Sequence, residues 1–160
     1  MRTAIVSGTF DPITVGHLNV IERAAILFDK VVVAVSVNSE KNGFLPDDIR
    51  VRAVEASVSH LGNAEVALCD GLLAEFCQKY ENPVIVRGVR NGSDFDYEHG
   101  LFVINQGLGV AETVMLPAQS GMEHISSTYA RELIKFNLNT ESVIPESAYH
   151  VMEEWLGNNK

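Results

Sequence analysis

The turn from Gly8 to Pro12 is the first segment whose residue types suit chemistry. It follows a short apolar run and leads into a segment of helical spacing that starts near His17. A glycine-bearing turn of this kind points backbone N–H groups and the positive end of a helix dipole at a bound group, which suits phosphate. The ring of His17 adds a further N–H donor. The alternative is that the polar residues of the turn only shape it and cap the helix, and the residues alone leave both interpretations open.

A second segment of this kind carries two arginines, Arg87 and Arg90, with Gly88 between them. Two guanidinium groups can clamp a polyphosphate through bidentate hydrogen bonds, while a glycine lets the backbone come close. The alternative is that both arginines are ion-pair partners of the acids that follow at Asp94, Asp96 and Glu98. Glu98 could equally orient an arginine or accept a hydrogen bond from a ribose.

The run Ser126, Ser127 and Thr128 opens a further predicted helix. It supplies hydroxyls and N–H groups at another positive helix end, where anions bind. Capping of the helix explains one of these residues but not three. Lys41 lies in the one long polar loop, 38–48, and long loops in compact domains are often functional.

Five short runs rich in Val and Ile predict strands that are covered on both faces. They lie at Thr3 to Ser7, Val31 to Val35, Glu65 to Leu68, Pro83 to Val86 and Glu112 to Leu116. Segments of helical spacing separate them, and two more helices are expected near 126–137 and 145–157. This alternation predicts an α/β, Rossmann-like parallel five-stranded sheet with helices on both faces and C-terminal helices. Ligands of such sheets bind beyond the carboxyl ends of the strands, where the arginines and the Gly8 turn lie.

Composition narrows the class of protein further. A chain of 160 residues with 46% hydrophobic residues fits one domain over 1–160, and its apolar runs are far shorter than the roughly 20 residues of a membrane span. A net charge of −9 argues against nucleic acid as a partner. The N-terminus reads as a strand without a secretory signal, which predicts a cytoplasmic protein. The spacing of Cys69 and Cys77 suggests buried thiols and no metal site.

Taken together, these motifs resemble the bacterial phosphopantetheine adenylyltransferase family of the nucleotidyltransferase superfamily, over nearly the whole chain. The segments that carry the resemblance are Gly8 to His17, Lys41, Arg87 to Glu98 and Ile125 to Thr128. Thr14 to His17 has the T-x-G-H form of this family, whereas relatives acting on nicotinate mononucleotide or glycerol phosphate usually carry His where Thr14 stands. The Arg-Gly-x-Arg run that continues to Asp-Phe-x-Tyr-Glu is more specific still.

The resemblance implies an enzyme that joins ATP and 4′-phosphopantetheine to give dephospho-coenzyme A and pyrophosphate, with Mg²⁺ carried on ATP and no dedicated metal site. It also implies a homohexamer. By matching positions, the substrate side comprises Thr9, Lys41, Arg87, Leu72 and Leu73. The ATP side comprises Thr9, Phe10, His17, Gly88, Arg90, Glu98, Ser126, Ser127 and Thr128. The catalytic roles go to His17 on the α-phosphate and to Lys41 and Arg90, which offset charge as pyrophosphate departs.

Several positions depart from the family pattern. Ser7 stands where Pro is common and Val15 where Asn is common, and Met122-Glu123-His124 replaces a segment with aromatic residues. Thr128 followed by Arg131 also resembles the ending found in the nicotinate mononucleotide relatives. Two alternatives therefore stay open: adenylyl transfer to nicotinate mononucleotide, and a nucleotide sensor without catalysis.

Overall fold

The computed structural model describes residues 1–37, 43–109 and 112–158. Its strands are β1 (Thr3–Gly8), β2 (Lys30–Val37), β3 (Ala64–Asp70), β4 (Pro83–Val89) and β5 (Glu112–Pro117). Its helices are α1 (Val15–Leu27), α2 (Asp47–Val58), α3 (Leu73–Cys77), α4 (Gly92–Gly107), α5 (Ser127–Lys135) and α6 (Glu146–Asn158). The predicted alternation of strands and helices is confirmed.

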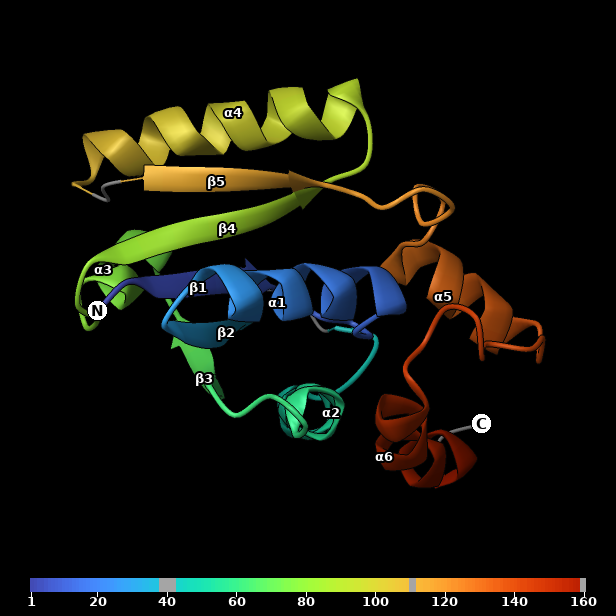
Figure 1. Ribbon diagram of the computed structural model, residues 1–160. Helices are drawn as coiled ribbons and strands as arrows, with labels where there is room; N and C mark the ends of the chain where they lie inside the picture. The colour runs from blue at the N-terminus through green and yellow to red at the C-terminus, as the bar shows by residue number, and fades with distance from the viewer. Residues whose placement is uncertain (38–42, 110–111, 159–160) are drawn as a thin grey trace.

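The strands form one parallel sheet in the order β3-β2-β1-β4-β5 (Figure 1). The chain builds outward from β1 through β2 to β3, and then returns to the other side of β1 with β4 and β5. The strand order therefore reverses between β1 and β4, which is where open α/β sheets hold their ligands. This junction lies at the carboxyl ends of the strands, next to α5 (Figure 1).

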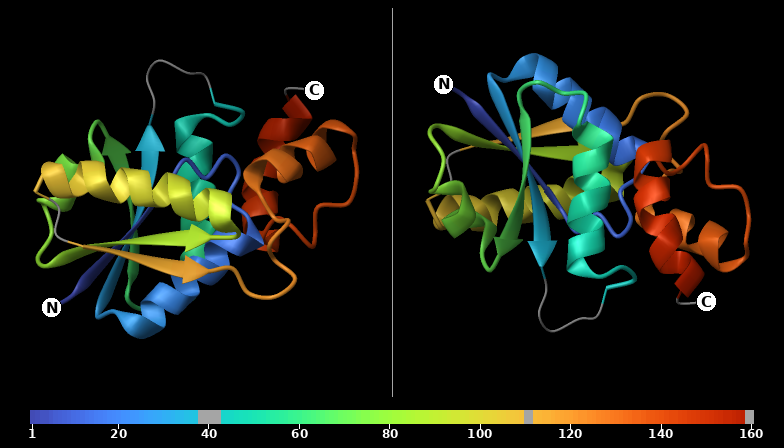
Figure 2. Two further views of the ribbon diagram at one scale, coloured as in Figure 1. Left: turned by 90° about the horizontal axis from the view of Figure 1, so that it is seen from above. Right: turned by 90° about the horizontal axis from the view of Figure 1, so that it is seen from below.

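Alternating residues of the buried strands pack into two cores on opposite faces of the sheet. Figure 2 shows α4 over one face of the sheet and α1 and α2 over the other. In β2, Val31, Val33 and Val35 pack on the side of α1 and α2, whereas Val32 and Ala34 pack on the side of α3. Branched apolar residues on both faces suit a parallel strand that no water reaches. The prediction of helices on both faces is thus confirmed.

The C-terminal helices lie beyond the carboxyl end of the sheet, and α6 packs against α2. The backbone N–H of Val15 donates to the carbonyl of Val143 at 2.8 Å, which fixes the start of α1 to the segment before α6. Within the described ranges, no helix combines the length and apolar character needed to cross a membrane.

Candidate active site

A cavity of about 520 Å³ opens at the carboxyl ends of β1 and β4 and reaches the first turns of α1, α4 and α5. Ten of the residues predicted from the sequence line it: Thr9, Phe10, His17, Arg87, Gly88, Arg90, Glu98, Ser126, Ser127 and Thr128. The fold therefore brings together segments that lie more than a hundred positions apart in the chain.

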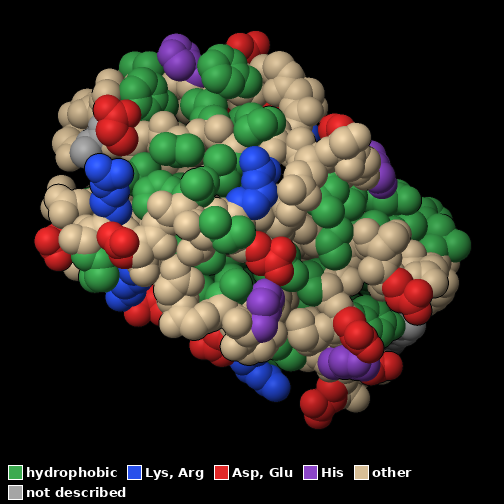
Figure 3. Space-filling view, in the orientation of Figure 1, with side chains coloured by type: hydrophobic (Ala, Val, Ile, Leu, Met, Phe, Trp, Pro, Cys, Tyr) green, Lys and Arg blue, Asp and Glu red, His purple; other side chains and the backbone are tan. Residues whose placement is uncertain are grey.

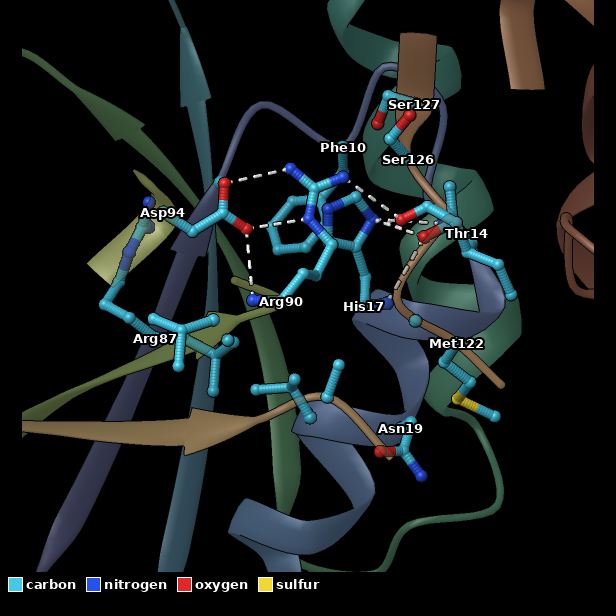
Figure 4. A pocket seen from close by; sticks show the side chains of 18 of the residues that line it. Phe10, Thr14, His17, Asn19, Arg87, Arg90, Asp94, Met122, Ser126 and Ser127 are labelled. Atoms are coloured by element: carbon cyan, nitrogen blue, oxygen red, sulfur yellow. Dashed lines mark hydrogen bonds and ion pairs between the residues drawn. The ribbon is translucent and has the colours of Figure 1, made fainter. Parts of the chain in front are cut away.

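A capping box between Thr14 and His17 opens α1 (Figure 4). The hydroxyl of Thr14 accepts the backbone N–H of His17 at 3.3 Å, and the backbone N–H of Thr14 donates to Nδ1 of His17 at 3.1 Å. A backbone N–H can only donate, so Nδ1 must carry a lone pair. In the neutral ring, the hydrogen is therefore on Nε2, which makes that atom a hydrogen-bond donor.

The surroundings of His17 keep its ring neutral. Burial, followed by the positive charges of Arg87 and Arg90, lowers the pKa of His17 from 6.5 to about 4. Desolvation and nearby like charges both disfavour the protonated imidazole. At neutral pH, the cavity thus contains a neutral N–H donor held beside two guanidinium groups.

The ring of Phe10 packs against the imidazole ring of His17. Phe10 is 2% exposed, and its ring meets the imidazole edge-on at a centroid distance of 5.2 Å. Its backbone has a φ of 48°, in the left-handed region. The side chain then lies against Gly8, where an added Cβ would sit 3.2 Å from the ring. Gly8 therefore leaves the space that Phe10 occupies.

Arg87 is held from two sides by acceptors. Its Nε and Nη2 donate to the two carboxylate oxygens of Glu98 at 2.8 and 2.7 Å, and its Nη1 donates to the carbonyl and the hydroxyl of Ser7. Glu98 is 7% exposed, so this is a nearly buried bidentate ion pair. Of the two roles open for Glu98 in the sequence, the structure shows the orientation of an arginine. Ser7, where the family commonly has Pro, supplies the other anchor.

Arg90 is oriented by Asp94, one helical turn further on. Its Nε and Nη2 donate to the two carboxylate oxygens of Asp94 at 2.8 and 3.1 Å (Figure 4). The hydrogen bond from Arg90 lowers the pKa of Asp94. Nη1 of Arg90 also lies 3.4 Å from the carbonyl of Ile125, which joins the start of α4 to the segment before α5. The guanidinium is thus fixed in one plane at the cavity wall.

The three hydroxyls at the start of α5 each have a partner within the protein. Ser126 caps the helix by accepting the backbone N–H of Tyr129 at 3.1 Å. Ser127 donates to the carbonyl of Pro12 at 2.9 Å, and Thr128 accepts from Arg131 at 3.1 Å. Capping does account for only one of the three, as the sequence indicated. What α5 offers a ligand is its first backbone N–H groups, which have no acceptor inside the helix.

The structure adds cavity residues that the sequence did not identify. Nδ2 of Asn19 donates to Oε1 of Gln119 at 2.9 Å, which joins α1 to the segment after β5 across the cavity wall. Asp94, which the sequence offered as an ion-pair partner of the arginines, also lines the cavity. The four-residue spacing from Arg90 to Asp94 at a helix start was the available signal for that pair. Nothing in the spacing of Asn19 and Gln119 indicated their contact.

Two predicted substrate residues, Leu72 and Leu73, lie apart from the cavity lining. Leu72 is 54% exposed just before α3, and Leu73 packs against the core on the α3 face of the sheet. Both follow the carboxyl end of β3, and their assignment to the pantetheine arm stays a prediction. Lys41 lies outside the described residues.

Comparison with known proteins agrees with this geometry. Residues 5–133 match the cytidylyltransferase-like family. The chain is 44% identical over 142 residues to the phosphopantetheine adenylyltransferase of Cutibacterium acnes, covering 89% of this chain and 90% of that protein. It is 37% identical to the protein of the same name from Streptomyces coelicolor, covering 99% of both.

The fold also matches a solved structure. A putative nicotinate-nucleotide adenylyltransferase from Vibrio parahaemolyticus superposes with a TM-score of 0.74, covering 98% of this chain and 94% of that one. The two sequences are 20% identical, so this likeness concerns the fold alone.

Proposed function

The chain belongs to the phosphopantetheine adenylyltransferases within the cytidylyltransferase-like family, and from this premise we propose that it transfers the adenylyl group of ATP to 4′-phosphopantetheine. The products are dephospho-coenzyme A and pyrophosphate, and the reaction belongs to coenzyme A synthesis. The observation that carries the proposal is the neutral Nε2–H donor of His17, fixed by Thr14 beside Arg90 in the cavity at the strand-order reversal.

His17 acts on the α-phosphate of ATP. The phosphate of the acceptor is already an anionic nucleophile at neutral pH, so the enzyme supplies position and charge stabilisation, not a general base. In-line attack on the α-phosphorus increases negative charge on its oxygens, and Nε2 of His17 donates a hydrogen bond there. A neutral donor suits this step because it needs no proton transfer in either direction.

Arg90 stabilises the departing pyrophosphate. Its guanidinium is oriented by Asp94 and lies at the same cavity wall as the first N–H groups of α5. A fixed cation and a helix N-terminus together favour an anion that forms during the reaction. We assign the same charge-offsetting role to Lys41, and Gly88 lines the same cavity.

Thr9 and Arg87 hold the acceptor phosphate on the other side of the cavity. Thr9 is exposed at the end of β1, and Arg87 lies on neighbouring β4, held by Glu98 and Ser7. The preorganised guanidinium loses little freedom when it binds a phosphate. Leu72, Leu73 and Lys41 complete the acceptor side in this proposal.

We expect Mg²⁺ to arrive on the phosphates of ATP. Across the described ranges, no group of three or more His, Cys, Asp or Glu side chains is placed to hold a metal ion. The donors that face the cavity from His17, Arg87 and Arg90 suit phosphate oxygens and not a cation. When bound, Mg²⁺ neutralises phosphate charge and thereby favours loss of pyrophosphate.

A homohexamer is the proposed assembly. The outer surface of α4 exposes apolar side chains, and Figure 3 shows hydrophobic side chains gathered along the edge of the molecule where this helix lies. On this helix, the exposed apolar side chains include Phe95 (48% exposed), Val103 (56%) and Ile104 (59%). Exposed apolar side chains gathered in one region favour an interface. Light scattering on the purified chain gives the number of subunits, and a monomeric mass would contradict the proposal.

The buried thiols support a cytoplasmic location. Cys69 and Cys77 are both free and both buried. Burial raises the pKa of each thiol, to about 11 for Cys77, so neither is an activated nucleophile. Unpaired cysteines are typical of a reducing compartment, and we propose that the protein works in the cytoplasm.

Release of pyrophosphate tests the choice of acceptor. The enzyme is incubated with ATP and Mg²⁺, and then with either 4′-phosphopantetheine or nicotinate mononucleotide. Thr14, in the place where the nicotinate mononucleotide relatives have His, favours release with phosphopantetheine alone. Release only with nicotinate mononucleotide would support that alternative, and no release with either acceptor would support the nucleotide sensor.

A further inference from the structure

Arg50 is a buried charge that none of the steps above uses. It lies on α2, is 4% exposed and does not line the cavity. Its Nε is the one buried side-chain nitrogen or oxygen without a hydrogen-bond partner among the described residues. Replacing a buried ion pair by apolar side chains of similar volume is often neutral or stabilising, so such a pair is weak evidence for a role in stability. The contacts that the other donors of Arg50 make indicate what else this residue does.

The remaining donors of Arg50 join the ends of two neighbouring strands. Nη1 donates to the carbonyl of Thr9 at 2.6 Å and to the carbonyl of Ser36 at 2.8 Å. The register between β1 and β2 ends at Gly8 and Val35, so Thr9 and Ser36 are the next residues on each strand. Beyond this point, β2 continues along β3 to Val37, whereas β1 leaves the sheet.

Nη1 of Arg50 thus links β1 and β2 just beyond the last pair of residues that the two strands match in register. Two carbonyls cannot bond each other, and a donor with two hydrogens can satisfy both. Asp47, one turn earlier on α2, accepts from Nη2 and holds the guanidinium in place. Both bridged residues, Thr9 and Ser36, line the cavity. The guanidinium of Arg50 therefore fixes the distance between Thr9 and Ser36 where both line the cavity.

We propose that Arg50 is a positioning residue for the acceptor: by bridging the carbonyls of Thr9 and Ser36, it fixes the direction in which Thr9 meets the acceptor phosphate. The inference rests on the proposed function, which assigns the acceptor phosphate to Thr9. His17 and Arg90, on the ATP side, are held by other contacts, to Thr14 and Asp94. Loss of the bridge should accordingly affect the two substrates unequally.

The test compares KM and kcat for each substrate in Arg50→Met, Arg50→Lys and the parent. In Arg50→Met, kcat/KM for 4′-phosphopantetheine falls about tenfold or more while KM for ATP stays within about threefold, because Thr9 loses its anchor while His17 and Arg90 keep their contacts to Thr14 and Asp94. Arg50→Lys keeps the positive charge but loses the planar guanidinium. It gives an intermediate fall in kcat/KM for 4′-phosphopantetheine, again with little change in KM for ATP. The matched control is Arg52→Met, on the same helix at an exposed position, which behaves as the parent.

The parent is assayed first, so that failure of the proposed function is seen as an inactive parent. With an active parent, equal losses for both substrates would mean a general structural role and would overturn the inference. An unchanged kcat/KM for phosphopantetheine in folded Arg50→Met would overturn it too. If Arg50→Met does not fold, the same comparison is decided by Arg50→Lys, for which unfolding is followed by circular dichroism.

Discussion

The backbone N–H of Thr14 donates to Nδ1 of His17 across 3.1 Å, and the hydroxyl of Thr14 lies at the same distance from that atom. A contact that opens helix α1 therefore also determines which nitrogen of His17 carries the hydrogen. Structural capping and catalysis are not alternatives at this turn, because the first produces the donor that the second needs.

Replacing His17 by alanine should remove the donor to the α-phosphate. The expected result is a fall in kcat of about 100- to 1000-fold, the usual effect of losing one preorganised donor in acyl or phosphoryl transfer. The far-ultraviolet circular dichroism should change little. His60→Ala is the matched control, since His60 is an exposed histidine paired with Glu22 at the surface. A His17→Ala enzyme within about threefold of the parent would rule out this role.

The low pKa of His17 predicts how stability depends on pH. The folded chain keeps His17 neutral down to about pH 4, whereas the unfolded chain protonates it near 6.5. Between these values the unfolded state binds the extra proton, so the free energy of unfolding falls as the pH falls and is restored above 6.5. Urea unfolding at neutral pH and at about pH 5 should show a larger loss for the parent than for His17→Gln. Equal losses in the two proteins would contradict the shift.

The ion pair of Arg90 with Asp94 predicts a selective effect on ATP. Asp94→Asn removes the charged acceptor that orients the guanidinium, so kcat/KM for ATP should fall about tenfold while KM for the acceptor changes little. Asp96→Asn, at an exposed position of the same helix, provides the control. Steady-state kinetics with each substrate varied in turn makes the comparison. An effect of equal size in both variants would mean that surface charge alone matters.

Gly88 allows α1 to pack closely on β4. A Cβ at this position would lie 2.8 Å from Cγ2 of Val20, and Val20 is 8% exposed, so it has little room to move. Gly88→Ala should lower the free energy of unfolding by about 1–3 kcal/mol. Combining it with Val20→Ala should cost less than the sum of the two single changes, which denaturant unfolding would show. Gly100→Ala, where an added Cβ meets nothing within 4 Å, is the control. Strictly additive losses would contradict the close contact.

Patterns of apolar residues predicted most of the fold, because a strand that is buried on both faces of a sheet is a continuous apolar run in the sequence. Val31 to Val35 is such a case, and it forms the centre of β2. The apolar spacing of Leu72, Phe76 and Tyr80 indicates a helix as far as Tyr80, whereas α3 ends at Cys77 in the structure. Beyond that residue the backbone tightens, since Tyr80 donates to the carbonyl of Cys77, three residues back. Apolar spacing does not distinguish these two kinds of turn.

The sequence predicted the residues of the candidate site whose role follows from their own side chain. It predicted less well the roles that depend on a contact between two residues. His17 stands at a helix start in the sequence itself, but the choice of its tautomer depends on a contact seen only in three dimensions. Arg50 shows the same limit. A charged residue on a helix suggests a solvated surface, whereas an exposure of 4% and the contacts of its guanidinium show that Arg50 holds its neighbours in place.

The fate of the α-phosphorus of ATP is the most direct test of the account. With ATP labelled at that atom, Mg²⁺ and 4′-phosphopantetheine, chromatography should show the label in dephospho-coenzyme A and an equal amount of pyrophosphate. The label should never be found on the protein, since the acceptor phosphate attacks directly. Label recovered as free AMP, on the protein, or unchanged in ATP would contradict direct adenylyl transfer at this site.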